Sequence, residues 1–297
     1  MIPTLWGVSM HLLYPFAKRF IAGEDLPAAL ANIQNLNQDG YLSTVDVLGE
    51  DTYHPEQAET AKQEYLRLLK EMSAHDFPLD LSLKLSQMGL NIDWDLCRRN
   101  VEEIIQKAGR HSVRFDMEGS DTTQRILDMC VDLHATYKNL GVVLQAYLRR
   151  TDGDIDRVIR EGISTRLCKG AYGEPPEIAY QDMTQIRAQF FKQAQRLLKE
   201  GFLPAIATHD EKLIRQIMDF VKREKIPVKT FYFEMLYGVR RDLQKALLDK
   251  GYQMRIYGPY GKSWLPYTLR RLAERKENIF FVIKNLVRET LGLGRLH

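Results

Sequence analysis

Hydrophobic and polar residues alternate on two length scales along this chain. Short aliphatic or β-branched runs recur, and each is followed by a longer charged stretch with helical spacing of its apolar residues. The short runs predict eight strands, Tyr41–Leu48, Leu79–Ser86, Ser112–Met117, Val142–Tyr147, Ser164–Ala171, Leu203–Thr208, Thr230–Met235 and Gln253–Tyr257. The intervening stretches predict helices, among them Pro55–Ser73, Trp94–Lys107, Met183–Glu200 and Glu211–Glu224. Because alternating strands and helices form parallel sheets, the pattern predicts an α/β fold, a (β/α)8 barrel of the TIM type.

Two further segments flank the predicted barrel. Leu12–Leu36 predicts one or two helices before the first strand, with a cover across the barrel bottom as the hypothesis for their position. Phe280–Leu291 predicts an extra amphipathic helix, which we interpret as packing on the barrel, with docking to a membrane surface as the alternative. We expect one domain over 1–297, divided into an N-terminal helical segment at 1–40, the barrel at 41–279 and a C-terminal helix or tail at 280–297.

Charged residues recur at strand positions that should face the interior of the barrel. Successive side chains of a strand point to opposite faces of the sheet. In the second predicted strand the outer face is leucine-rich, which places Ser82, Lys84 and Ser86 toward the lumen. By the same count, further lumen-facing residues are Asp46, Arg114, Asp116, Gln145, Arg166, Arg255 and Tyr257. Because unpaired charges are costly to bury, these groups must be ion-paired, hydrated or presented to a ligand.

Lys84 and Asp116 stand out among these charges, because they fall on neighbouring strands at similar heights. Such a pair keeps both groups ionised and can position a substrate, but a buried salt bridge with no catalytic part explains the spacing equally well. Ion pairing alone likewise accounts for Arg114 and Arg255. The position of the charges toward the C-terminal ends of the strands, where barrel enzymes have their active sites, favours an enzyme.

The ends of the fifth and sixth predicted strands have the residue types of an anion site. The segment Arg166–Tyr172 combines two cations with a glycine, which suits close approach of a pyrophosphate. A turn glycine beside solvated charges is the alternative. The segment Ala207–Asp210 precedes a predicted helix, whose N-terminus would attract a phosphate, although Thr208 or Asp210 could simply cap it.

Two adjacent arginines follow the eighth predicted strand. Arg270 and Arg271 lie four and three residues before the acidic Glu274, so an ion pair on a helix surface explains them by itself. Two neighbouring guanidinium groups can also hold a carboxylate through paired hydrogen bonds.

Composition narrows the class of protein. The net charge of +3 is small and the basic residues are dispersed, which argues against a nucleic-acid partner. Three cysteines without a CxxC pair predict neither a disulfide framework nor a zinc site, and no His/Cys cluster has metal-ligand spacing. No glycine-rich dinucleotide fingerprint follows a strand. Without an evident signal peptide or membrane span, we expect a cytoplasmic protein, with contact to the inner face of the membrane left open.

Taken together, the motifs resemble the proline dehydrogenase family of flavoenzymes, from about Lys18 to about Val282. The matching segments are Phe20–Asp25, Leu48–Glu50, Leu83–Ser86, Arg114–Glu118, Gln145–Leu148, Arg166–Tyr172, Ala207–His209, Arg255–Pro259 and Tyr267–Glu274. The resemblance implies a distorted barrel with FAD across the C-terminal ends of the strands. It also implies oxidation of L-proline to Δ1-pyrroline-5-carboxylate, the first step of proline catabolism, with electrons passed to a quinone. The oligomeric state stays open.

The resemblance also implies roles for individual residues. Asp116 and Arg166 are the catalytic candidates, Asp116 through its contact with Lys84 and Arg166 through its position against the flavin. The implied substrate-binding residues are Lys84, Leu236, Tyr257, Tyr267, Arg270 and Arg271, the last two as a clamp for the proline carboxylate. The implied FAD-binding residues are Met117, Gln145, Arg166, Lys169, Gly170, Ala171, Thr208, His209 and Glu274.

The sequence departs from the family pattern after Tyr172, where Gly173–Pro176 predicts a different loop beside the cofactor. Cys168 also replaces a more usual aliphatic residue. Three alternative functions stay open. A 4-hydroxyproline dehydrogenase is one, against which Tyr257 argues because those enzymes tend to have a small residue there. The others are a barrel lyase or isomerase with Lys84 as a Schiff base, and a non-catalytic barrel that binds an amino acid.

Overall fold

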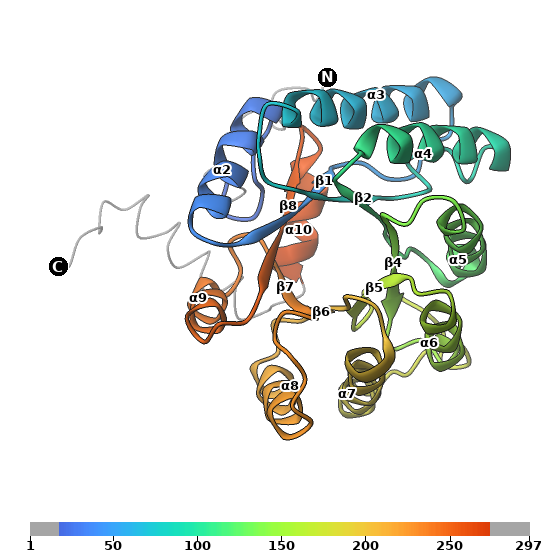
Figure 1. The fold of residues 1–297 in the computed structure, drawn as a ribbon. Coiled ribbons are helices and arrows are strands. Elements are labelled where there is room, and N and C mark those ends of the chain that lie inside the picture. The colour runs from blue at the N-terminus through green and yellow to red at the C-terminus, as the bar shows by residue number, and fades with distance from the viewer. Residues whose placement is uncertain (1–17, 274–297) are drawn as a thin grey trace, which may run out of the picture.

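A computed structural model describes residues 18–273 of the 297-residue chain. Eight parallel strands form a closed barrel in sequence order, and β8 pairs back to β1 (Figure 1). The strands are β1 (Leu42–Val47), β2 (Asp80–Leu83), β3 (Ser112–Phe115), β4 (Leu140–Gln145), β5 (Ser164–Cys168), β6 (Ala205–Ala207), β7 (Tyr232–Leu236) and β8 (Met254–Tyr260). The predicted (β/α)8 barrel is therefore confirmed.

Helices alternate with the strands and form an outer ring (Figure 1). They are α3 (Pro55–Met72), α4 (Trp94–Ala108), α5 (Ser120–His134), α6 (Thr151–Arg160), α7 (Met183–Glu200), α8 (Glu211–Arg223) and α9 (Arg241–Asp249). Aspartate side chains begin several of them by accepting hydrogen bonds from first-turn amides, as Asp93 does for α4 and Asp182 for α7. These caps fix where each helix starts after its strand.

Several strand ends differ from the prediction. The second strand stops at Leu83 instead of Ser86, because the chain turns after Lys84, whose carbonyl accepts from the amides of Gln87 and Met88. The fifth strand stops three residues before Ala171, while the eighth runs three residues beyond Tyr257. The fourth begins two residues before the predicted start. Lys84 therefore lies beyond the end of its strand, at the C-terminal mouth of the barrel.

The helix that precedes the barrel seals its side. In the described part of the predicted N-terminal helical segment, α2 (Leu26–Gln38) packs against β1 and β8 on the outer face of the barrel, between α9 and α3 (Figure 1). The amide of Ala22 donates to Pro259 O at 2.7 Å, which ties the approach to α2 to the end of β8. This placement corrects the hypothesis of a cover across the barrel bottom.

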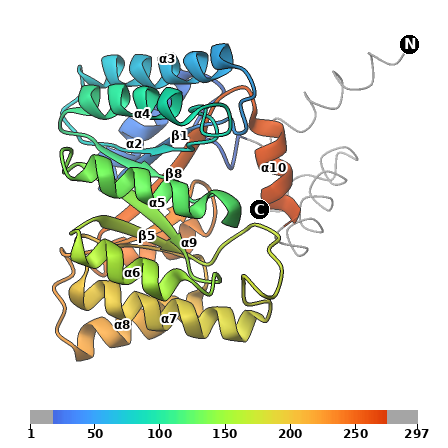
Figure 2. The same cartoon turned by 90° about the vertical axis from the view of Figure 1, so that its right-hand side faces the viewer.

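The helix after β8 does not complete the outer ring. Figures 1 and 2 place α10 (Trp264–Ala273) over the C-terminal ends of the strands. Trp264 and Tyr267 of this helix pack with Phe20 and Ile21 from the segment before α2. The predicted helix at 280–291 lies outside the described residues.

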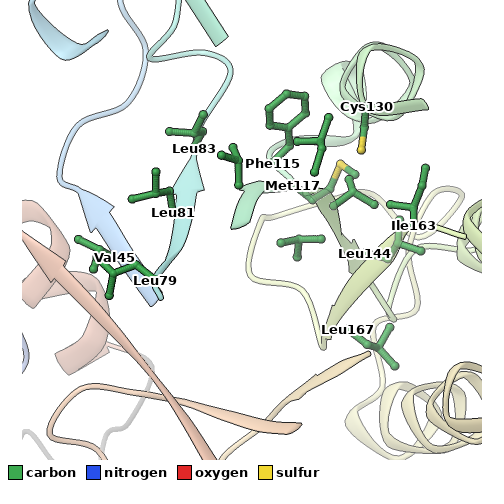
Figure 3. Packing of buried hydrophobic residues seen from close by; sticks show 14 of the residues in the cluster. Val45, Leu79, Leu81, Leu83, Phe115, Met117, Cys130, Leu144, Ile163 and Leu167 are labelled. Atoms are coloured by element: carbon green, nitrogen blue, oxygen red, sulfur yellow. The ribbon is translucent and has the colours of Figure 1, made fainter. Parts of the chain in front are cut away.

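The apolar core lies between the strands and the outer helices. Outward-facing residues such as Leu81, Leu83 and Phe115 are fully buried there, as strand alternation predicts. Figure 3 shows part of this cluster, from Val45 across Phe115 to Leu144. Across residues 18–273, no helix combines the length and apolar character that a membrane span requires.

Candidate active site in the barrel lumen

The floor of the lumen is an ion network centred on Asp80, which is fully buried. Its Oδ2 lies 3.1 Å from Arg114 Nε, 3.3 Å from Arg166 Nη2 and 3.1 Å from Arg255 Nη1. Its Oδ1 accepts a hydrogen bond from Ser112 Oγ at 2.7 Å. Burial alone would raise the pKa of Asp80, but the guanidinium groups outweigh it and hold that pKa below its ordinary value.

Arg255 is held in this floor mainly by charge. Its guanidinium carbon lies 3.9 Å from the ring centroid of Tyr232, a cation–π contact. Among residues 18–273 neither Nε nor Nη1 of Arg255 has a hydrogen-bond partner, so its 3.1 Å approach to Asp80 is an ion pair without hydrogen-bond geometry. Ion pairing with Asp80 therefore explains why Arg114 and Arg255 can be buried in the lumen.

Arg166 on β5 connects the floor to the mouth. Its Nε donates to Glu234 Oε2 at 2.9 Å, and its Nη1 donates to Asp116 Oδ1 at 2.9 Å. The ring centroid of Tyr257 lies 5.1 Å from its guanidinium carbon. Burial alone would lower the pKa of Arg166, but Glu234 and Asp116 raise it, so the side chain is a fixed cation. Arg166 is thus oriented from below and from the side.

Lys84 lies at the mouth with two carboxylates beside it. Its Nζ donates to both carboxylate oxygens of Asp46 at 3.0 Å, whereas Asp116 Oδ2 lies 3.6 Å away. The predicted contact with Asp116 is present as a long ion pair, but Asp46 is the hydrogen-bonded partner. Burial alone would lower the pKa of Lys84, and the two aspartates raise it above its ordinary value. A Schiff-base lysine needs a neutral amine, so this pairing argues against the lyase alternative.

Asp116 joins Arg166 to Tyr257. Its Oδ1 accepts from Ser82 Oγ as well as from Arg166, and its Oδ2 accepts from the Tyr257 hydroxyl at 3.0 Å. Burial and the carboxylates of Asp116 and Asp46 raise the pKa of Tyr257 well above its ordinary value. The phenol therefore stays protonated, and its ring is held in one orientation at the mouth.

The loop after β5 requires glycine at position 170. Gly170 has φ +109°, and a Cβ there would lie 2.1 Å from Cδ1 of Tyr147. The Tyr147 hydroxyl donates to the carbonyl of Tyr172 at 3.1 Å, which holds the loop against the end of β4. Farther along, Glu174 accepts from the amide and the hydroxyl of Ser120, at 2.7 and 2.6 Å. Glu174, from the segment that departs from the family pattern, thus caps α5.

Asp210 organises the cations at the end of β6. It caps α8 by accepting from first-turn amides, and its Oδ2 lies 2.7 Å from both Lys169 Nζ and Arg187 Nε. The helix N-terminus is therefore occupied by a carboxylate, and an anion here would approach Lys169 and Arg187. Nε2 of His209 accepts from the amide of Leu236 at 2.9 Å, which assigns the proton of its neutral ring to Nδ1. Thr208 accepts from the amide of Asp210, so Asp210 and not Thr208 caps α8.

The other predicted site residues differ in their exposure to solvent. Gln145 is buried at the end of β4 and donates to the carbonyl of Glu118 at 2.9 Å. The Met117 side chain packs in the core cluster outside the barrel, as alternation predicts. Ala171 is exposed on the loop after β5, and Tyr267 is buried on α10.

The arginine pair belongs to α10, over the mouth. Arg270 and Arg271 fall within that helix, but their side chains lie outside the described part of the structure. Glu274 also lies outside the described residues. The clamp for a carboxylate therefore stays a prediction, with the helix that carries it in a suitable place.

Sequence reasoning overlooked three acidic roles in this lumen. Asp80 and Glu234 were not singled out, and Asp46 was only placed on the lumen side. The signal was available for each, because Asp80 precedes Ser82 by two residues and Glu234 lies on the same face of its strand as the inward residues. Which acid pairs with which base depends on the register between strands, such as Asp46 opposite Ser82.

The fold and this lumen define a barrel enzyme whose polar groups converge at the C-terminal mouth. The sequence model of the family described as Proline dehydrogenase matches residues 29–284. Proline dehydrogenase 2 of Bacillus subtilis (strain 168) is 37% identical over 275 residues, 92% of this chain and 91% of that protein. The proline dehydrogenase of Deinococcus radiodurans is 33% identical over 293 residues, 96% of this chain and 94% of that protein. The chain therefore belongs to the proline dehydrogenase family and is an oxidoreductase.

A solved structure agrees with this assignment. The crystal structure of proline utilization A (PutA) from Bdellovibrio bacteriovorus inactivated by N-propargylglycine matches with a TM-score of 0.85 and 25% identity. The match covers 92% of this chain and 34% of that longer chain. The likeness extends over nearly the whole barrel described above.

The donor groups at the mouth fit the flavin that the family implies. Arg166 within β5 and Lys169 just after it are cations, Arg187 of α7 adds a third, and Gly170 lets the backbone turn closely there. Arginine and lysine side chains bind phosphate groups through charge-assisted hydrogen bonds. The residues present are therefore compatible with FAD at the C-terminal ends of β4 to β6.

Proposed function

We propose that this chain oxidises L-proline to Δ1-pyrroline-5-carboxylate with FAD as cofactor and a quinone as electron acceptor. The observation that carries the proposal is the convergence of Lys84, Asp116, Arg166 and Tyr257 at one mouth, within a member of the proline dehydrogenase family. FAD, when bound, supplies the acceptor for the hydride that leaves the substrate carbon. No protein nucleophile is needed, and the side chains act by binding and orientation.

Lys84 and the two arginines of α10 would hold the substrate carboxylate. Lys84 is a fixed ammonium whose side chain is 14% exposed, so its charge is partly open to the mouth. Arg270 and Arg271 would contribute from α10, the helix that lies over the strand ends. A carboxylate held between the two has one orientation, which fixes the rest of the small substrate relative to the cofactor.

Asp116 and Tyr257 would form the other side of the pocket. The partly exposed carboxylate of Asp116 suits the N–H of the proline amine, and the phenol ring suits its methylene groups. The hydrogen bond from Tyr257 to Asp116 keeps this ring in place, which favours proline over 4-hydroxyproline. Leu236 and Tyr267 would complete the apolar wall.

The cofactor would lie along the ends of β4 to β6. Gln145, Lys169, Gly170, Ala171, Thr208 and His209 are the residues proposed to hold it, with Met117 contributing through its backbone. Arg166 would face the reacting end of the flavin as a fixed cation. Reoxidation by a quinone would take place at the inner face of the membrane, on a protein otherwise in the cytoplasm.

The test is an anaerobic titration. The purified protein, supplied with FAD, is expected to be yellow, to bleach with L-proline and to regain colour on addition of a short-chain quinone. Inactivation by N-propargylglycine, the compound used on the Bdellovibrio relative, is expected as well. A protein that binds no FAD, or whose flavin is not reduced by proline, would overturn the proposal. Faster reduction by trans-4-hydroxy-L-proline would favour the hydroxyproline alternative.

A further inference from the structure

We propose that Asp46 is a positioning residue for proline oxidation, which acts through Lys84 by holding that ammonium in one orientation at the barrel mouth. The inference rests on the proposed function. It assigns to Asp46 the part that sequence reasoning gave to Asp116, namely the control of Lys84.

The geometry separates the two aspartates. Asp46 accepts two hydrogen bonds from Lys84 Nζ, both 3.0 Å long, while Asp116 at 3.6 Å accepts none from it. The oxygens of Asp116 are already occupied, by Arg166 and Ser82 on one and by Tyr257 on the other. Asp46 therefore serves Lys84, and Asp116 serves Arg166 and Tyr257.

Burial gives the pair a direction. The Asp46 side chain is 2% exposed and the Lys84 side chain 14% exposed, so the carboxylate lies beneath the ammonium. An ammonium group has three N–H donors, and the direction of those that bind Asp46 fixes the direction of those left for the mouth. Asp46 thereby decides which way the remaining N–H of Lys84 points.

Several titratable groups surround Lys84 in the described part of the chain. Besides Asp46 and Asp116 they are Glu118, after β3, and Tyr172, in the loop after β5. Tyr257 of β8 faces Asp46 as well as Asp116. Neutralising Asp46 leaves only longer-range negative charges to oppose the burial of Lys84, so the pKa of Lys84 should fall from its raised value.

This pairing predicts a specific kinetic pattern for Asp46→Asn. The ammonium then has no hydrogen-bonded carboxylate to orient it and loses its proton at lower pH, so binding of the substrate carboxylate weakens. We expect KM for proline to rise roughly ten- to a hundredfold, as for the loss of one charge-assisted hydrogen bond, with a smaller change in kcat. The alkaline limb of kcat/KM should move to lower pH. Asp46→Glu, which keeps the charge, should recover part of the loss.

A matched control exists on the outside of the barrel. Lys62 is also held by two carboxylates, Glu59 at 2.9 Å and Glu103 at 2.8 Å. Glu103→Gln makes the same change of charge beside a lysine that has no part in the site. It should leave KM and the pH profile as in the parent protein.

A readout independent of turnover follows the amine of Lys84 directly. Only the neutral amine reacts with acetic anhydride, so the rate at which Lys84 is acetylated reports its protonation, measured by mass spectrometry against pH. We expect Lys84 to become reactive at lower pH in Asp46→Asn than in the parent. The reactivity of Lys62 should be the same in both proteins.

The decisive test adds Asp46→Asn to a Lys84→Met background, where a residue that acts through Lys84 should change KM little further. An unaltered KM, pH profile and acetylation rate in Asp46→Asn with full FAD content would overturn the proposal. So would an undiminished effect of Asp46→Asn in Lys84→Met. If Asp46→Asn does not fold, Asp46→Glu and the double variant, which leaves no unpaired buried charge, decide in its place. A parent protein that proline does not reduce is a separate failure, of the proposed function itself.

Discussion

At the scale of single residues, Asp80 supplies negative charge to the buried cations in the floor of the lumen. It is the common partner of three arginines beneath the mouth. We predict that Asp80→Asn lowers the free energy of unfolding by about 3–5 kcal/mol, because it leaves buried cations without their counter-charge. Urea denaturation checks this. Asp132→Asn, which removes the surface partner of Arg98, should change stability by no more than about 0.5 kcal/mol. Equal effects of the two substitutions would contradict the network.

Glycine substitutions give a second prediction at this scale. Gly170→Ala should destabilise the protein by about 1 kcal/mol or more and weaken FAD retention, since its positive φ and the Tyr147 ring both exclude a Cβ. Gly153→Ala, in α6 with open space around it, should stabilise by about 0.5–1 kcal/mol. Thermal unfolding and the ratio of flavin to protein absorbance measure both. Shifts of the same sign would refute the assignment.

At the scale of elements, α10 packs against the segment that precedes α2. Phe20 and Ile21 pack against Trp264 and Tyr267 of that helix. We predict that Phe20→Ala raises KM for proline several-fold through a loosened α10, with little change in the urea midpoint of the barrel. Steady-state kinetics and urea denaturation separate the two effects. Phe202→Ala, at a side chain 52% exposed, is the control and should alter neither.

The elements also show how far the sequence alone could lead. Strand order and most helix bounds followed from periodicity, and Met183–Glu200 was predicted to the residue. Strand ends were missed where side-chain alternation continues past the last ladder bond, as at Lys84 and Ser86. The position of α2 against β1 and β8 was not predicted, because a hydrophobic stripe indicates that one face of a helix is buried but not which strands bury it.

At the scale of the whole molecule, the contributions of Asp80 and Glu118 to stability change with pH in opposite directions. The pKa of Asp80 is lowered, so its contribution to stability is present above the ordinary value of about 3.9 and is lost as the pH falls below it. Burial raises the pKa of Glu118, so its contribution is present at low pH and is lost as the pH rises through its ordinary range. We predict that Asp80→Asn flattens the acid side of the stability profile and that Glu118→Gln flattens the other. Urea midpoints measured across pH test this, and unchanged slopes would contradict it.

The sequence was enough to predict which residues form the candidate site, but not which acidic residue pairs with which basic one. Alternation placed Lys84, Asp116 and Arg166 on one surface, and the structure brings them together. The pairing of Lys84 with Asp46 and of Arg166 with Glu234 could not be read from spacing, because each depends on how the side chains of nearby strands are aligned in the folded sheet. Periodicity assigns a face, whereas the choice among acids on that face is made by strand register.

The seal between the first and last strands has a consequence for biosynthesis. α2 leaves the ribosome before any strand of the barrel, yet one of the two strands it covers, β8, is the last strand to be made. Until β8 arrives, α2 can pack only on β1, and the edge of β1 that pairs with β8 has no native partner. A nascent chain that stalls before β8 therefore exposes part of α2 and the edge of β1. We expect such truncated chains to bind chaperones that recognise exposed apolar surface.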